Sequence, residues 1–462
     1  MLLVGLLGFL FGLLVLPARA TYGARTTADE PQYLLSALSV WEDGSLDIGD
    51  ELAAERWRDF HEADLPVQTE PLADGRTISP HDPLLPVLLA VPVGLGGWIG
   101  AKVALAAAGG ALAAVLVFTA HRRFGVPVPI AGVVVAAAAV SPPLAAYAGQ
   151  VYPELPAALA VAVAVASITG PLERRGRWAF AAAVTALPWL AVKYVPVAAC
   201  LAAAGLWRLG RRAERRAATC VAVGLGLTAV AYAVAHRLLY GGWTVYAAGD
   251  HFTGGELTVV GSDPDYAGRS RRLLGLLVDR DFGLLRWAPL WALAVPAVGA
   301  LLRRRPPGTD VVLLPLGAGW AVAAWVALTM HGWWWPGRQV VVVLPLAVLA
   351  VAWWAAQVRG VATLAAALGA VGAASWLWLL FDVVVLDHLR LIIDFAQTSN
   401  PLSRWWRLAL PELRTPLAGD WLRYAAWLVL AAAGALLGWR SVAPRSRAHP
   451  EVPERIPIDA PV

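Results

Sequence analysis

Long apolar segments recur along the chain, and short polar connections separate them. About twelve of these segments approach or reach the length that spans a bilayer as an α-helix. The pattern therefore predicts an all-α polytopic membrane protein with about twelve transmembrane helices. The expected spans cover residues 2–19, 99–119, 126–145, 151–169, 178–190, 193–208, 217–239, 285–302, 311–330, 338–357, 361–386 and 421–439.

The connections between these spans sort by charge. Basic connections such as ERRGR (173–177) and RLGRRAERR (208–216) fall on one side, and the longer outer loops 21–82, 240–284 and 387–420 fall on the other. Because basic loops stay in the cytoplasm, we expect a protein of the cytoplasmic (inner) membrane with both termini cytoplasmic. We divide it into a transmembrane domain, 1–440, and a disordered cytoplasmic tail, 441–462.

Composition agrees with a membrane protein, because 59% of the residues are hydrophobic and only 15% are charged, against about 25% charged in soluble domains. The net charge of +5 does not indicate a nucleic-acid partner, since the basic residues cluster in short loops. Two cysteines exclude a disulfide framework and a cysteine-based metal site. Residues 2–20 also resemble a signal peptide; cleavage there would leave the outer loop outside.

The first outer loop has helical signals of its own. We expect a juxtamembrane amphipathic helix with one apolar face, a second short helix at 56–62, and an interfacial segment at 83–94. The apolar face consists of Tyr33, Leu34, Ala37, Leu38 and Trp41.

Two adjacent acids, Asp29 and Glu30, follow the first span directly. A carboxylate at this position can deprotonate an acceptor hydroxyl or amine as a general base. The alternative is a helix start, with Asp29 as N-cap and Glu30 and Pro31 in the first turn. The two interpretations are compatible, since a cap also fixes geometry.

Three further charged residues stand at the outer ends of spans. Glu154 begins the fourth span, Lys193 lies between two short spans, and Arg338 begins the tenth. Lysine and arginine here suit a lipid phosphate, the lysine as a point charge and the arginine as a bidentate fork. The alternatives are a helix start for Glu154, snorkelling to headgroups for Lys193 and an interfacial anchor for Arg338.

Other polar and aromatic residues are candidates for lining the same cavity: His81, Asp82, Tyr33, Tyr152, His331 and Trp333. No cofactor is certain. A divalent metal ion held by Asp29, Glu154 and His81 is compatible with these side-chain types, although no ligand spacing among them is diagnostic. There is no P-loop, no nucleotide-binding glycine fingerprint, no nucleophile elbow and no HExxH motif.

A first span, then Asp-Glu at the start of a long outer loop, then about eleven spans resembles the GT-C glycosyltransferase superfamily. Within that superfamily, the chain most resembles protein O-mannosyltransferases and the aminoarabinose transferase of lipid A. The resemblance is strongest around 26–41, 79–86, 147–156, 187–196 and 332–339. It implies a GT-C-like fold, a catalytic carboxylate at Asp29, an assisting acid at Glu154 and a phosphate-binding lysine at Lys193.

The resemblance also implies an activity. The expected enzyme moves a sugar from a polyprenyl-phosphate donor to an envelope acceptor on the outer face, as an inverting transferase. Two other classes stay open: a transporter or flippase of lipid-linked sugars, and a non-catalytic subunit with the same fold. A transporter usually shows repeated halves and charges near the bilayer midplane, neither of which is visible in the sequence.

Overall fold

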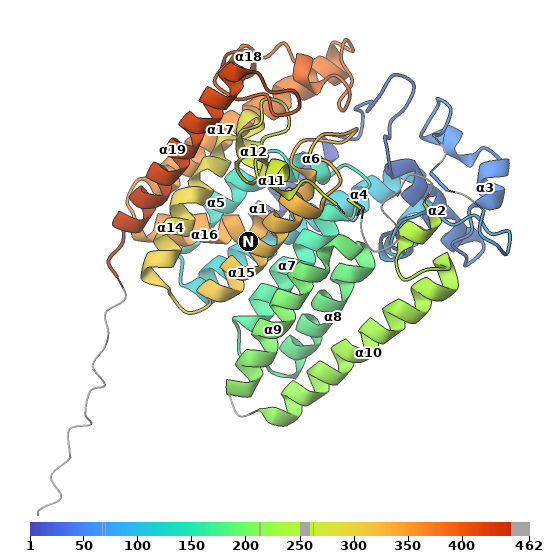
Figure 1. Ribbon diagram of the computed structural model, residues 1–462, viewed down its shortest axis with the longest axis horizontal. Helices are drawn as coiled ribbons and strands as arrows, with labels where there is room; N and C mark the ends of the chain where they lie inside the picture. The colour runs from blue at the N-terminus through green and yellow to red at the C-terminus, as the bar shows by residue number, and fades with distance from the viewer. Residues whose placement is uncertain (67, 70, 212–213, 250–258, 262, 445–462) are drawn as a thin grey trace, which may run out of the picture.

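The structure is a computed structural model that describes residues 1–462 except 67, 70, 212–213, 250–258, 262 and 445–462 (Figure 1). Its framework is helical, and extended segments in the described part make only isolated β-bridges. The helices of the main bundle, with the short helix α12 packed against it, are α1 Leu2–Leu13, α4 Leu84–Phe124, α5 Val128–Ala139, α6 Leu144–Tyr147, α7 Glu154–Ile168, α8 Arg174–Leu190, η2 Val192–Tyr194, α9 Val195–Arg211, α10 Arg215–Tyr240, α12 Arg272–Val278, α13 Leu284–Trp287, η4 Pro289–Leu293, α14 Ala294–Arg304, α15 Thr309–Ala321, η5 Val322–Val326, η6 Arg338–Val343, α16 Leu344–Gln357, α17 Val361–Leu380, η7 Phe381–Val385 and α19 Ala418–Arg440.

Shorter helices lie in the outer loops. These are α2 Glu30–Glu42, α3 Gly49–Ala53, η1 Arg56–Asp59, η3 Val245–Ala248, α11 Tyr266–Arg269, η8 Phe395–Gln397 and α18 Pro401–Arg407. The juxtamembrane helix expected after the first span is therefore present as α2, and the short helix expected at 56–62 is the single turn η1.

Each of the twelve expected spans falls on helix, which confirms the predicted all-α membrane architecture. Seven helices among the described residues are long and apolar enough to cross a membrane, and α1, α5 and α7 are shorter apolar helices. The segment at 83–94, expected to lie apart from the span that follows, is the first arm of α4. Non-helical backbone at Gly96 and Gly97 divides the two arms of this helix.

Burial separates central helices from peripheral ones. The apolar stretch of α16 is 89% buried, whereas those of α10 and α19 are 0% and 6% buried. Figure 1 shows α10 and α19 along opposite edges of the molecule. Their exposed leucines and valines are the surface that a lipid phase would cover.

The polar connections divide between two ends of the bundle. The arginine-bearing C-terminal end of α9, the N-terminal end of α10 and the arginine-rich α14–α15 connection lie with the end of α19 at the lower side in Figure 1. Helices α2, α3, α11 and α18 lie towards the opposite side. This division agrees with the grouping by charge; which end faces the cytoplasm stays a prediction, and most of the tail 441–462 lies outside the described residues.

The first outer loop is fastened to the rest of the molecule. Most of α2 is buried against α4, including Tyr33, Leu34 and Ala37. Trp41 departs from the expected buried face: it is partly exposed, with its ring lying over Gly94. The late outer segment also reaches this loop, because the backbone N–H groups of Leu391 and Ile392 donate to the carbonyls of Arg19 and Ala20.

Candidate active site

Four charged side chains from distant parts of the sequence meet in one network. Arg338 donates from Nη2 to Asp29 Oδ2 at 2.5 Å and from Nε to Glu154 Oε1 at 2.9 Å. Lys193 Nζ donates to the same Glu154 oxygen at 2.8 Å and lies 3.5 Å from Gln339 Oε1. The sequence-predicted residues Asp29, Glu154, Lys193 and Arg338 are therefore neighbours in space.

Asp29 stands at the N-cap position of α2 but does not act as a cap. Its side chain makes no capping hydrogen bond and instead binds Arg338. The preceding residue, Ala28, has a φ of 47°, a left-handed conformation that a non-glycine residue rarely adopts. The local backbone therefore turns the Asp29 carboxylate towards the charged network, away from the N–H groups of its own helix.

The other three residues begin or join helices. Glu154 is the first residue of α7, and Lys193 lies in the single turn η2 between α8 and α9. Arg338 begins η6 directly after Gly337, whose φ of 87° suits glycine. A Cβ at Gly337 would also lie 2.6 Å from the Leu284 side chain, so this tight approach needs a glycine.

Burial distinguishes the members of this network. The Glu154 side chain is fully buried, whereas the side chains of Asp29 and Lys193 keep 22% and 21% exposure. Burial raises the pKa of Asp29, but Arg338 and His81 outweigh that effect and hold the pKa well below its usual range. Asp29 is therefore a carboxylate in this arrangement, with an accessible edge.

Aromatic rings enclose the guanidinium of Arg338. Its central carbon lies 4.2 Å from the ring centre of Tyr152 and 5.0 Å from that of Trp334. The planar guanidinium of arginine stacks on such rings better than the ammonium of lysine does. Tyr152 was expected in the cavity from its sequence position; Trp334, one of three adjacent tryptophans, was not.

Tyr33 and His81 flank the Asp29 side of the network. Their ring centres lie 4.6 Å apart, and His81 Nε2 is 3.7 Å from Asp29 Oδ1. His81 Nδ1 is 2.7 Å from the Ser79 hydroxyl, which fixes the ring orientation. His81 therefore lies beside the Asp29 carboxylate, with Tyr33 against its ring, and their expected part in lining a substrate cavity stays a prediction.

Glu30 has a different environment from its neighbour Asp29. It is buried and accepts hydrogen bonds from the backbone N–H groups of Thr27 and Val151, at 3.2 and 2.8 Å. Burial raises the pKa of Glu30, opposed by the charge of Lys102 and by these N–H groups. Glu30 thus links the first outer loop to the turn at Val151 through backbone hydrogen bonds, and it does not belong to the Asp29 network of ion pairs.

Asp82 supports the turn that carries Lys193. Its Oδ2 accepts from the backbone N–H of Val192 at 2.9 Å, and its Oδ1 lies 3.0 Å from both Tyr232 Oη and His236 Nε2. The sequence analysis missed Tyr232 and His236. A signal was present, since these two polar residues, four positions apart, share one face of an expected membrane span.

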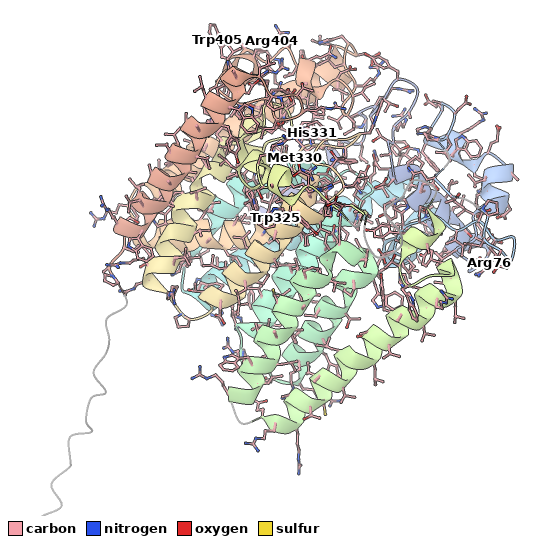
Figure 2. The ribbon with its side chains drawn as sticks, in the orientation of Figure 1. Arg76, Trp325, Met330, His331, Arg404 and Trp405 are labelled. Atoms are coloured by element: carbon pink, nitrogen blue, oxygen red, sulfur yellow. The ribbon has the colours of Figure 1, made fainter. Side chains whose placement is uncertain are left out.

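His331 and Trp333 lie apart from the four-residue network. His331 Nε2 is 3.4 Å from Asp279 Oδ2, among the outer loops and beside Met330 (Figure 2). The Trp333 side chain is largely exposed, although its backbone carbonyl accepts a hydrogen bond from Thr27 Oγ1 at 2.7 Å. Their expected part in a common substrate cavity stays a prediction.

The metal-ligating set that the sequence leaves open, Asp29, Glu154 and His81, is not among the groups of converging ligand atoms in the described residues. In the described ranges, ligand atoms that gather within 4.8 Å of one another belong to Asp279, His331 and Glu412 and to Asp43, Asp50 and Glu51. Asp29 and Glu154 instead share the cation Arg338. A guanidinium between them leaves no reason to assign an ion to Asp29, Glu154 and His81.

Comparison with known proteins identifies the fold. No family model matches the chain, and no curated protein matches it. Among solved structures, it is similar to the crystal structure of ArnT from Cupriavidus metallidurans bound to undecaprenyl phosphate. The TM-score is 0.52 and the identity 17%, over 96% of this chain and 77% of that chain. The chain therefore has the GT-C-like membrane fold that its sequence predicts.

Proposed function

We propose that this protein is a GT-C-type glycosyltransferase that uses a polyprenyl-phosphate sugar and works on the outer face of the cytoplasmic membrane. The observation that carries the proposal is the buried network of Asp29, Glu154, Lys193 and Arg338. Two acids and two cations, two of them partly exposed, supply both a base and a phosphate clamp. The undecaprenyl phosphate in the structure of ArnT supports a lipid phosphate as the ligand class.

In this proposal, donor binding changes the partner of Arg338. The donor phosphate takes hydrogen bonds from Arg338 and Lys193, which are both held by Glu154 in the described arrangement. Asp29 then loses its nearest cation, so its pKa rises towards the usual carboxyl range. A carboxylate released in this way is a better proton acceptor at the moment when the donor is present.

The reaction then proceeds as a single displacement with inversion. Asp29 takes the proton of the acceptor hydroxyl or amine, and the acceptor atom forms a bond to the anomeric carbon. The bond from that carbon to the phosphate oxygen breaks, and its electron pair leaves with the polyprenyl phosphate. Lys193 and Arg338 stabilise the charge that develops on this leaving group, while Glu154 and His81 orient the cations and Asp29.

The test is transfer from a panel of radiolabelled polyprenyl-phosphate sugars in proteoliposomes that contain wild type or Asp29→Asn. We expect turnover with one donor and a loss of about 10²–10⁴-fold in the variant, the usual contribution of a general base. Glu30→Gln is the matched control, because Glu30 is the adjacent acid and does not belong to the Asp29 network. Equal turnover by wild type and Asp29→Asn would exclude Asp29 as the base.

A further inference from the structure

A second group of ligand-type side chains lies in the outer loops, away from the Asp29 network. Asp279 follows α12, His331 lies in the loop before η6, and Glu412 lies in the segment before α19. Each offers one ligand atom, and the three atoms lie within 4.8 Å of one another. These residues are far apart in sequence, so the convergence is a product of the fold.

The spacing suits a small divalent ion. Zinc binds histidine nitrogen and carboxylate oxygen at about 2.0–2.2 Å in tetrahedral geometry, so two of its ligand atoms lie about 3.3–3.5 Å apart. His331 Nε2 and Asp279 Oδ2 are 3.4 Å apart. That separation is too long for a good hydrogen bond and matches two ligands of one ion.

His331 has a buried nitrogen without a hydrogen bond. Its Nε2 atom is inaccessible to solvent and finds no hydrogen-bond partner in the described part of the chain. The ring is held against Phe282, with 5.0 Å between ring centres and an interplanar angle of 81°. A buried imidazole nitrogen needs a partner, and a metal ion in front of it supplies one.

Backbone groups orient both carboxylates. Asp279 is almost fully buried, and it accepts from the N–H groups of Asp281, Phe282 and Leu413, at 3.1, 2.8 and 3.1 Å. Glu412 Oε1 accepts from the N–H of Arg414 at 2.8 Å.

Two neighbouring arginines pair with other acids. Arg280 pairs with Asp420, and Arg286 pairs with Asp281. No arginine or lysine among the described residues forms an ion pair with Asp279 or Glu412. This group therefore has two negative charges and one imidazole, which is a donor set for a cation.

We propose that Asp279, His331 and Glu412 bind a divalent transition-metal ion of the first row, with Zn²⁺ as the first probe. The ion would fix the loop 327–337, which leads into Arg338, against the segment that precedes α19. That loop also reaches the first outer loop through Trp333 and Thr27. Its role is structural, and the proposal does not depend on sugar transfer.

The test measures metal content and thermal unfolding of the full-length protein in detergent. After purification without chelator, we expect about one ion per chain by elemental analysis, removed by EDTA. Zn²⁺ added back to the stripped protein should raise Tm by several degrees, because an ion that binds only the folded state stabilises it. Mn²⁺, Mg²⁺ and Ca²⁺ are tested in parallel.

The variants assign the effect to these residues. His331→Gln removes the nitrogen ligand and keeps the backbone contacts of Asp279, so it should lower Zn²⁺ affinity at least about 100-fold without preventing folding. Glu412→Gln should act in the same direction. Asp50→Asn, in the acidic group at α3, is the matched control and should retain the full response. Absence of any ion-dependent Tm shift in wild type, or a full shift in His331→Gln, would overturn the proposal.

Discussion

Two groups of charged side chains, the Asp29 network and the Asp279 group, differ in their balance of charge. The Asp29 network has two acids and two basic side chains, all joined by ion pairs. The Asp279 group has two acids and a histidine, with no arginine or lysine among their described ion-pair partners. The Asp29 network can offer Arg338 and Lys193 to an arriving phosphate, whereas the Asp279 group can accept a cation. The pairing of the acids, rather than their number, therefore indicates which kind of ligand each group suits.

The largest effect is expected from removal of Arg338, the cation that joins Asp29 to Glu154. Arg338→Met leaves Asp29 and the fully buried Glu154 with Lys193 as the remaining cation of the network. Breaking a buried ion pair from one side costs about 3–5 kcal/mol. We expect a large fall in Tm in detergent together with loss of transfer.

Arg338→Lys is the matched variant for charge. It keeps a positive group but loses the bidentate fork and the stacking on Tyr152 and Trp334. We expect most of the stability to return while transfer stays low. Full transfer by Arg338→Lys would mean that the network needs only a point charge at this position.

A smaller effect is expected from the residues that support the η2 turn, which carries Lys193. His236→Phe removes one partner of Asp82, which holds the backbone of the η2 turn. Loss of a hydrogen bond to a charged group is worth about 1.5–3 kcal/mol when buried, so we expect KM for the donor to rise about tenfold with kcat little changed. Tyr232→Phe, which removes the other partner, should act similarly. A fall in kcat at constant KM would show that Asp82 and its partners Tyr232 and His236 do not position Lys193.

The smallest expected effect concerns a third group of acids, Asp43, Asp50 and Glu51. Burial, together with the nearby carboxylates of Asp50 and Asp43, raises the pKa of Glu51 to about 8 from 4.5. The folded state then keeps a proton that the unfolded chain releases, so stability falls as pH rises from about 4.5 to about 8. Glu51→Gln should be more stable relative to wild type at pH 8 than at pH 5, by about 2 °C in Tm. An equal difference at both pH values would contradict protonation of Glu51.

Much of the fold was predictable because lipid imposes long apolar helices. All twelve expected spans are helical. The expected site residues Asp29, Glu154, Lys193 and Arg338 meet, and each stands at a helix end or in a short turn between helices, where charged groups are tolerated.

Other features depend on contacts between segments far apart in sequence. Glu30 and Asp29 are adjacent in sequence, yet one binds backbone N–H groups and the other binds Arg338. The Asp279–His331–Glu412 group has no spacing signal, since its members are more than fifty residues apart. The contact of Arg338 with both Asp29 and Glu154 is likewise invisible in the sequence, so a metal ion at these acids was left open there.

The measurement that tests the central claim most directly is the affinity of polyprenyl phosphate for wild type, Lys193→Met and Lys102→Met. Lys102 and Lys193 are the two lysines of the chain. The Nζ atom of Lys102 donates to the Arg25 carbonyl, and its charge acts on Glu30, which does not belong to the Asp29 network. We expect Lys193→Met to weaken binding at least about tenfold, equal to 1.4 kcal/mol, and Lys102→Met to bind within about twofold of wild type. Equal affinity of Lys193→Met and wild type would contradict a phosphate site in the Asp29 network.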